Sequence, residues 1–293
     1  MAAATKESKI GFIALGDIGL PMASHLLKGG FDLQVYDLRK EAVEKAVALG
    51  ARAAESVKAM AASCSYICIA VVNEAQMRSV ISGPDGLFEN ARPGTTVIAH
   101  STIPPETAKE FARLAEAKGV EWLDAPMSGA SIAAKAGTLN FLVGGKAELL
   151  ERCRPILNAM GANIFHLGPT GAGAVGKLVN GLLLHVGYVV TLEALKLAAA
   201  CDVPEEKIIE LVRVSTGNNW VIEHWGYFDR LIEEHTQGPE ELIQTLLRKD
   251  IADALIAAKA AKTTLPMAGL AIQLYPELTS ERRARRIAAG KKP

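Results

Sequence analysis

The sequence predicts an α/β domain with a mainly parallel sheet, followed by an all-helical domain that a long helix joins to it. In the first half of the 293 residues, short apolar runs alternate with helical segments, which is the pattern of βαβ units. After Gly173 the pattern favours helices only. Between the halves, residues 172–201 contain no proline and would form a helix about 45 Å long at ~1.5 Å per residue.

The strands of the first half are predicted from short apolar runs. The run at 65–72 is apolar along most of its length, as expected when both faces of a sheet are covered. Helices are predicted between and after the strands, at 40–50, 104–119 and 146–161. The runs predicted as strands are residues 9–15, 31–38, 65–72, 95–99, 120–125, 141–145 and 162–167.

The second half reads as helices at 203–215, 223–235, 239–261 and 266–278. A glycine-rich loop at 168–173 places the boundary between a domain at 1–168 and one at 169–293. We expect the basic tail at 279–293 to be a solvated end rather than a charge-mediated contact.

The long helix carries apolar residues on nearly every face, so we expect protein to bury most of it. It is not predicted to span a membrane, because the uncharged run at 178–192 is shorter than the ~20 residues required. A semi-polar stripe shares one face at helical spacing. It consists of Lys177, Asn180, Gly181, Leu184, Tyr188 and Thr191.

Composition narrows the possible partners. The chain has 32 basic and 32 acidic residues, which argues against a protein that binds nucleic acid or a membrane surface through bulk charge. Small molecules and copies of the chain itself are the expected partners. The cysteines lack the paired spacing of metal ligands, so no metal site is predicted. We interpret them as reduced thiols of a cytoplasmic protein. No signal peptide is predicted. The cysteines are Cys64, Cys68, Cys153 and Cys201.

The turn after the first strand matches the dinucleotide-binding pattern G-x-G-x-x-G, with alanine at the first position. Gly16 would let the backbone approach a pyrophosphate, and Gly19 would let the helix pack on the strand. The helix N-terminus would add free N–H groups and partial positive charge. A Rossmann-like domain is therefore predicted, with the turn formed by Ala14, Leu15, Gly16, Asp17, Ile18 and Gly19.

Asp37, at the end of the second strand, bears on which dinucleotide binds. A carboxylate there accepts hydrogen bonds from a ribose diol and repels a 2′-phosphate, which favours NAD over NADP. The alternative is a plain strand-turn-helix. Ala14 adds a methyl group to a tight turn, and Asp17 brings negative charge near the expected pyrophosphate.

Five sequence motifs, spread in order over residues 9–278, match those of a known protein family. They are FIALGDIGLPMA, HSTIPPETA, DAPMSGASIAAKAGTLNFLVGG, GPTGAGAVGKLVNG and LLRKD. The chain resembles the β-hydroxyacid dehydrogenases, the group of 3-hydroxyisobutyrate and tartronate semialdehyde dehydrogenases, which is related to 6-phosphogluconate dehydrogenase. The resemblance implies NAD-dependent oxidation of a β-hydroxy acid to a semialdehyde or ketone. It also implies a homodimer or homotetramer.

The resemblance assigns roles to matching residues. Lys177 stands where the family has its catalytic lysine. Asn180 and Gly181 match an asparagine pair, so this chain lacks the second amide, which orients substrate in the family. The loop that binds the substrate carboxylate in the family matches Ser128, Gly129 and Ala130, with alanine replacing the last glycine. The family's cofactor contacts match Val71, Val72, Thr102 and Lys249, with Val72 replacing a proline.

Lys177 would serve as proton acceptor while nicotinamide takes the hydride. A lysine does this near neutral pH when its pKa falls from ~10.4 toward ~7, and apolar surroundings and a nearby cation act in that direction. Val175, Leu178 and Leu184 are expected to supply the apolar setting. The alternative is a lysine that extends to solvent. Residues 128–130, without the resemblance, read as an ordinary turn.

Gly181 and a nearby aromatic group suggest a hypothesis about substrate size. Glycine opens space beside Lys177, and aromatic residues would wall an enlarged pocket; packing in the core or between subunits is the alternative. These aromatics are Trp220, Trp225, Tyr227 and Phe228, whereas the isolated histidines His166, His185 and His224 read as structural.

Two rival functions remain open. An imine reductase-like enzyme would share the fold, but Lys177 and Asp37 argue against it. A dinucleotide-binding protein without turnover is kept open by Ala14, Val72 and Gly181.

Overall fold

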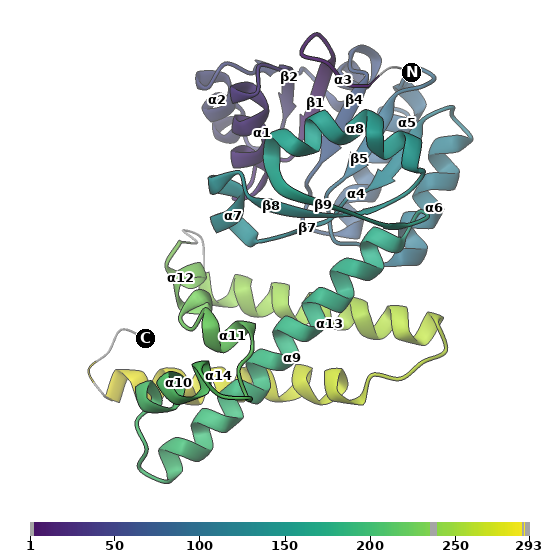
Figure 1. Cartoon of the computed structure of the whole chain (residues 1–293). Coiled ribbons are helices and arrows are strands. Elements are labelled where there is room, and N and C mark those ends of the chain that lie inside the picture. Colours follow the sequence, from purple (N-terminus) through teal and green to yellow (C-terminus); the bar gives the residue numbers. More distant parts are fainter. Residues whose placement is uncertain (1–2, 235–238, 289, 291–293) are drawn as a thin grey trace. The chain divides into compact units, whose positions relative to one another are not determined.

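The computed structural model describes residues 3–234, 239–288 and 290, with side-chain surroundings described for 3–230, 247–288 and 290. The chain divides into two compact units, Met1–Lys177 and Leu178–Pro293. The first is built on a sheet and the second is helical (Figure 1). The helix α9 (Ala172–Ala200) belongs to both, since the division falls within its second turn.

The sheet of the first unit has the strand order β3-β2-β1-β4-β5-β6-β8-β7, and β9 also pairs with β8. The strands from β3 to β6 run parallel, β8 is antiparallel to β6 and β7, and β9 is parallel to β8. The strand order reverses beside β1, which lies between β2 and β4. Ligands of such sheets bind outside the carboxyl ends of the strands at this point. The bounds are β1 Lys9–Ile13, β2 Asp32–Tyr36, β3 Arg52–Ala53, β4 Tyr66–Ile69, β5 Thr96–Ala99, β6 Glu121–Asp124, β7 Met127–Ser128, β8 Leu139–Gly144 and β9 Gly161–Gly168.

Helices cover both faces of this sheet, and each face has its own apolar core. On β1, Phe12 packs into one core and Ile13 into the other, as the two-residue period of a strand requires. Met22 of α1 joins the first core, and Phe111 of α6 joins the second. The helices are α1 Gly19–Lys28, α2 Lys40–Ala48, α3 Val57–Ser63, α4 Glu74–Ile81, α5 Leu87–Asn90, α6 Pro105–Glu116, α7 Ala130–Ala136 and α8 Ala147–Met160.

The seven predicted strands are all present, with ends that differ by a few residues. The short elements β3, β7, α3, α4, α5 and α7 lie in segments for which no element was predicted. Two of them carry a readable start signal: Ser56 accepts a hydrogen bond from the N–H of Ala59, and Asn73 accepts one from the N–H of Gln76. These side chains cap α3 and α4.

The second unit contains α10 (Glu205–Arg213), α11 (Trp220–Glu223), α12 (Tyr227–Glu234), α13 (Pro239–Ala260) and α14 (Pro266–Ala288). The helix predicted at 223–235 is present as α12 but begins later than predicted, because the chain turns between α11 and α12. Gly226 has a φ of +86° there, a left-handed conformation that interrupts a right-handed helix.

The basic tail is not a solvated end, which corrects the expectation for residues 279–288. Helix α14 continues to Ala288, and the Arg282 side chain is only 7% exposed. Its guanidinium donates hydrogen bonds of 2.8 and 3.0 Å to Asp229. Arg286 donates to the same carboxylate at 3.2 Å. A charge-mediated contact within the helical unit therefore holds this part of the tail, whereas residues 289 and 291–293 lie outside the described residues.

Helix α9 is long and apolar enough to cross a membrane by length and composition, with a mean hydropathy of 1.6 in its most apolar window. Of that window 44% is buried within the protein. Leu195 of α9 packs in a small core with Ile209 and Ile222. These contacts make α9 a core helix, although protein of the same chain covers less of it than the sequence suggested.

Candidate active site

The turn between β1 and α1 has the shape that a dinucleotide pyrophosphate requires. A Cβ on Gly19 would lie 2.0 Å from the carbonyl oxygen of Ala14, so only glycine allows α1 to approach the turn this closely. A Cβ on Gly16 would meet nothing within 4 Å. The backbone at Gly16 is thus open to a ligand, and the first N–H groups of α1 follow it. Ala14 has a φ of 75°, a region where L-residues are strained.

Asp37 joins this turn to the carboxyl end of β2. Its Oδ2 accepts a hydrogen bond of 2.7 Å from the N–H of Leu15, and its Oδ1 accepts one of 3.1 Å from Nε of Arg39. Partial burial acts to raise the pKa of Asp37, but the hydrogen bonds from Arg39 and Leu15 outweigh it and hold this pKa below its ordinary value. The carboxylate is therefore ionised, as the predicted hydrogen bonds with a ribose diol require.

Arg39 was not among the predicted site residues. Its side chain is 52% exposed and paired with Asp37. The signal was present in the sequence, since Arg39 follows by two residues the acid predicted to bind the ribose, and an arginine near that acid can accommodate an NADP 2′-phosphate.

The next two strands place their predicted residues at the same edge of the sheet. Ser101, just after β5, donates a hydrogen bond of 2.7 Å to the carbonyl oxygen of Val71, just after β4. The N–H of Val72 donates to Oε1 of Gln76 at 2.9 Å. Proline, which the family resemblance leads one to expect at this position, has no N–H to make that bond. Thr102 follows Ser101 and is partly buried.

Asp124, at the carboxyl end of β6, anchors the start of α9. The carboxylate is 1% exposed and accepts hydrogen bonds from the N–H groups of Gly171 (2.9 Å) and Ala174 (3.1 Å). Burial raises the pKa of Asp124, while these backbone hydrogen bonds act in the opposite direction. A Cβ on Gly173 would lie 2.3 Å from the carbonyl oxygen of Leu142. Glycine at this position therefore lets α9 begin directly against β8.

The loop at residues 128–130 leaves the sheet four residues after Asp124. Gly129 has a φ of +122°, and a Cβ there would lie 2.3 Å from Cβ of Ala133, so this position requires glycine. Ala130 has a φ of 50°, which is again the left-handed region. Both positions where alanine replaces a family glycine, Ala14 and Ala130, thus have positive φ.

Lys177 lies one helical turn beyond Ala174 and is half-buried. Of the residues expected to give it an apolar setting, Leu178 is 5% exposed, whereas Val175 is 48% exposed. Within a single copy of the chain, Val175 therefore does not give Lys177 apolar surroundings. The first unit contains Lys177 together with the turn at 14–19, Asp37, Val71, Val72, Thr102 and the loop at 128–130.

Asn180 and Lys249 belong to the second unit. Nζ of Lys249 lies 2.8 Å from Oδ2 of Asp253 and 3.8 Å from Oδ1 of Asp250. His185 is buried, and its Nε2 lies 3.6 Å from Oδ2 of Asp250. The expectation that His185 is isolated is therefore wrong.

The other two histidines singled out from the sequence make ordinary contacts. His166 Nε2 lies 2.9 Å from the carbonyl oxygen of Gly145, and His224 Nδ1 lies 3.0 Å from that of Trp220. In both contacts an imidazole nitrogen lies at hydrogen-bond distance from a backbone carbonyl oxygen, which fits a structural role.

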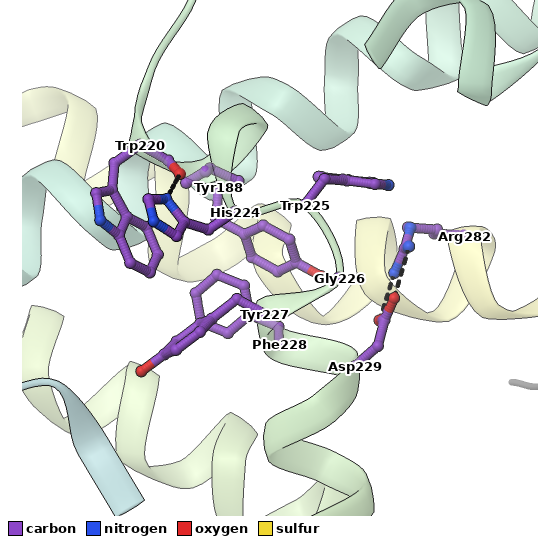
Figure 2. Close-up of a pocket in the computed structure, with 10 residues that line it drawn as sticks. Tyr188, Trp220, His224, Trp225, Gly226, Tyr227, Phe228, Asp229 and Arg282 are labelled. Atoms are coloured by element: carbon purple, nitrogen blue, oxygen red, sulfur yellow. Dashed lines mark hydrogen bonds and ion pairs between the residues drawn. The ribbon is translucent and has the colours of Figure 1, made fainter. Parts of the chain in front are cut away.

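The aromatic group of the second unit surrounds a small cavity (Figure 2). The cavity has a volume of about 10 Å³, room for about one water molecule. Trp225 stacks on the Arg282 guanidinium at 4.6 Å and donates a hydrogen bond to Glu205. The ring of Phe228 lies 4.1 Å from that of Tyr188. Trp225 and Phe228 thus pack the helical unit, which favours core packing over the hypothesis of a substrate-pocket wall.

Comparison with protein families assigns both parts of the chain. Residues 9–168 match the NAD-binding domain of 6-phosphogluconate dehydrogenase. Residues 171–286 match the family described as NAD-binding of NADP-dependent 3-hydroxyisobutyrate dehydrogenase. Together these matches cover nearly the whole chain.

Individual relatives agree with this assignment. The NAD-dependent L-serine dehydrogenase of Pseudomonas aeruginosa is 38% identical over 281 residues, covering 95% of this chain and 94% of that protein. The 3-hydroxyisobutyrate dehydrogenase of the same organism is 37% identical, covering 91% and 90%. The 2-(hydroxymethyl)glutarate dehydrogenase of Eubacterium barkeri is 34% identical, covering 92% and 89%.

Solved structures show the same relationship. The Mycobacterium tuberculosis 3-hydroxyisobutyrate dehydrogenase with L-serine is 29% identical, covers 94% of both chains and has a TM-score of 0.81. A Streptomyces aurantiacus imine reductase is 15% identical, covers 92% of this chain and 93% of its own, and has a TM-score of 0.66; this likeness shows the fold alone. The chain belongs to the β-hydroxyacid dehydrogenase family.

Proposed function

We propose that the chain oxidises a β-hydroxy acid with NAD and that Lys177 exchanges the hydroxyl proton. The observation that carries the role of Lys177 is the anchor of α9. Asp124 ties the first turn of α9 to the carboxyl end of β6, the edge of the sheet that also carries the turn at 14–19. Lys177 comes one turn later. A lysine fixed at this edge is positioned by backbone contacts rather than by a mobile loop.

Each group has a defined part in the reaction. Nicotinamide supplies the hydride acceptor when NAD is bound. As the carbinol C–H bond breaks, its electron pair leaves as hydride, the hydroxyl proton passes to Nζ of Lys177, and the C–O bond becomes a carbonyl. In the reverse direction Lys177 returns the proton. The Ser128 hydroxyl and the backbone N–H groups of Gly129 and Ala130 hold the substrate carboxylate.

The named relatives suggest the substrate class. L-serine, 3-hydroxyisobutyrate and 2-(hydroxymethyl)glutarate all carry a hydroxymethyl group on the carbon that bears a carboxylate. They differ in the further substituent on that carbon, which is ammonium, methyl or carboxyethyl. We therefore propose a substrate with this shared core, oxidised at its primary alcohol to a semialdehyde.

NADH formation with these three acids tests the proposal. Lys177→Ala should lower kcat by about 10² or more, while NAD binding, measured by calorimetry, stays unchanged. Lys196→Ala is the matched control, because Lys196 lies on the same helix in a surface ion pair with Glu281. A wild-type chain that binds NAD but oxidises none of the three acids would instead be a binding protein without turnover.

Apolar side chains on α9 support an oligomer. Four apolar side chains of this helix are between 49% and 75% exposed: Val179, Leu183, Val190 and Leu197. Exposed apolar side chains that gather on one element mark surfaces that another protein covers. We propose that a second copy covers them in a cytoplasmic homodimer or homotetramer. Light scattering after size-exclusion chromatography should show the oligomer, and Leu183→Glu with Leu197→Glu should shift it toward monomer.

A further inference from the structure

Two side chains hold the single peptide group that links Val71 to Val72. Oγ of Ser101 donates a hydrogen bond of 2.7 Å to the carbonyl oxygen of Val71. The N–H of Val72 donates one of 2.9 Å to Oε1 of Gln76. This carbonyl and this N–H belong to one planar trans unit and point in opposite directions. Hydrogen bonds on both sides therefore fix the orientation of the peptide plane.

Gln76 reaches this peptide from the first turn of α4. Asn73 is the N-cap residue of α4, and its Oδ1 accepts a hydrogen bond of 2.9 Å from the N–H of Gln76. A glutamine at the third helical position usually returns a hydrogen bond to the N–H of the N-cap residue itself. Here the side chain reaches one residue further back, to Val72. The capping interaction thus extends beyond the helix into the loop that precedes it.

Ser101 approaches the same peptide from the neighbouring strand. It follows β5, which pairs in parallel with β4, and it is only 4% exposed. Without this hydroxyl, the carbonyl of Val71 would lose its donor at a position that water reaches poorly. Ser101 therefore joins the loop after β4 to the loop that continues into Thr102.

The held peptide lies where the strand order reverses. Strand β4 pairs with β1, and the N–H of Ala70 donates to the carbonyl oxygen of Ile13 at 3.0 Å. The loop after β4 therefore begins beside the turn at 14–19, at the edge where ligands of such sheets bind. Val71 packs against an apolar core, whereas Val72 is 54% exposed. All of these residues belong to the first compact unit.

We propose that Gln76 and Ser101 are positioning residues for the cofactor, because they hold the 71–72 peptide so that the Val72 side chain lies against bound NAD. This rests on the proposed function, since it assumes that NAD occupies this edge of the sheet. The N–H of the peptide is already engaged, so the loop presents an apolar side chain to the cofactor rather than a backbone donor. Neither residue takes part in hydride or proton transfer. Their effect is therefore on the affinity for NAD.

Calorimetry of NAD binding to the full chain tests the role of Gln76. Gln76→Met keeps the length of the side chain but lacks the acceptor oxygen, so Kd for NAD should rise about 5-fold. Gln76→Glu keeps an acceptor and should retain most of the affinity. Ser79→Ala is the matched control, because Ser79 lies on the same helix and donates to the carbonyl oxygen of Gln76 at 2.9 Å. It should change Kd by less than about 2-fold.

A Val72→Pro background separates positioning of the loop from capping of α4. Proline has no N–H to donate, so Gln76→Met should change Kd by less than about 2-fold in that background. A glutamine that only stabilised α4 would have the same effect in both backgrounds. With NAD saturating, Gln76→Met should change KM for L-serine by less than about 2-fold.

Ser101→Ala tests the other side of the peptide and should raise Kd for NAD about 10-fold. Both hydrogen bonds hold the same peptide, and the second holds it less well once the first is lost. Ser101→Ala combined with Gln76→Met should therefore raise Kd by less than the product of the two single effects.

Two results would overturn the inference. One is a Gln76→Met chain that binds NAD as tightly as the wild type, and the other is a loss of affinity that is the same with and without Val72→Pro. Both leave the proposed function intact as long as the wild type reduces NAD with a β-hydroxy acid. A wild type that binds NAD but oxidises no acid would remove the proposed function alone, because the readout here is binding.

Discussion

The carboxylate of Asp124 accepts a hydrogen bond of 3.1 Å from the backbone N–H of Ala174, and this bond joins the central sheet to the helix that carries Lys177. A second bond, from Gly171, engages the other carboxylate oxygen at 2.9 Å. The position of the proposed proton acceptor therefore depends on a residue with no part in the chemistry.

Replacing Asp124 with asparagine should affect activity more than binding of NAD. One of the two acceptor oxygens becomes an NH₂ group that faces a backbone N–H, so we expect a loss of about 2 kcal/mol in the free energy of unfolding. The first turn of α9 should loosen, and kcat should fall about 10-fold or more because Lys177 loses its position. Urea unfolding and steady-state kinetics measure the two effects. Loss of stability with unchanged kcat would contradict the positioning role.

His100 predicts how stability changes with pH. It is 1% exposed, and burial lowers its pKa from 6.5 to about 4, although a hydrogen bond with Ala125 acts in the opposite direction. The unfolded chain therefore binds a proton at higher pH than the folded chain does. The contribution to stability is complete above about pH 6.5, decreases as pH falls, and is lost below about pH 4, a change of about 3 kcal/mol.

Urea unfolding at a series of pH values tests the His100 prediction. His100→Asn keeps a donor for the carbonyl of Ala125 but does not titrate, so the stability profile should flatten between pH 6.5 and 4. A profile with the wild-type slope in this variant would assign the pH dependence to other groups.

Ala14 and Ala130 predict that glycine stabilises the two binding loops. Both residues have positive φ, at 75° and 50°. Left-handed backbone costs an L-residue about 1–2 kcal/mol, and the greater freedom of glycine in the unfolded chain offsets part of the gain. Each change to glycine should therefore raise the free energy of unfolding by about 0.5–1 kcal/mol. Ala112→Gly, within α6, should instead lower it by about 1 kcal/mol, and equal effects at all three sites would refute the argument.

The Asp37–Arg39 pair predicts a change of cofactor preference. With Asp37 replaced by alanine, a ribose-binding carboxylate is lost and the half-exposed guanidinium is released from its ion pair. We expect kcat/KM for NAD to fall and that for NADP to rise, so that their ratio moves toward NADP by about 10-fold or more. Adding Arg39→Ala should remove the gain with NADP. If the double variant keeps that gain, Arg39 does not bind the phosphate.

Arg282 predicts that the basic tail is needed for the stability of the helical unit. Arg282→Met leaves the carboxylate of Asp229, itself largely buried, without the guanidinium that donates to it at 2.8 Å. Arg286 still donates to this carboxylate at 3.2 Å, so we expect the free energy of unfolding to fall by about 2 kcal/mol, the loss expected for hydrogen bonds to a charged group. Arg283→Met is the matched control on the exposed side of α14 and should change stability by less than about 0.5 kcal/mol. Equal effects of the two changes would show that Arg282 acts as surface charge only.

Much of the fold could be predicted because its signals are local. Alternating apolar runs predicted the parallel strands, and the glycine pattern after β1 predicted the turn, where Gly16 is open and Gly19 is tightly packed. The break at Gly226 was missed because one glycine in an apolar helical pattern is a weak signal until its φ is known. The ion pair that holds the basic tail was missed because Asp229 lies 53 residues before Arg282 in sequence.

The site was predicted less completely for the same reason. Lys177 stands out in sequence as a lysine on an apolar helix, whereas Asp124 looks like any residue at the end of a strand. Its role depends on backbone N–H groups 47 and 50 residues further along the chain. His185 looked isolated because its neighbour, Asp250, comes from a different helix.

The contact between Gly181 and His185 also constrains how this chain could change over evolutionary time. A methyl group at residue 181 would touch the imidazole at an ordinary distance of 3.8 Å, but an asparagine side chain would need the volume that the ring fills. Replacing Gly181 with asparagine would therefore require the imidazole to move. A smaller residue at position 185 would make that room, so the effects of changes at the two positions should not add.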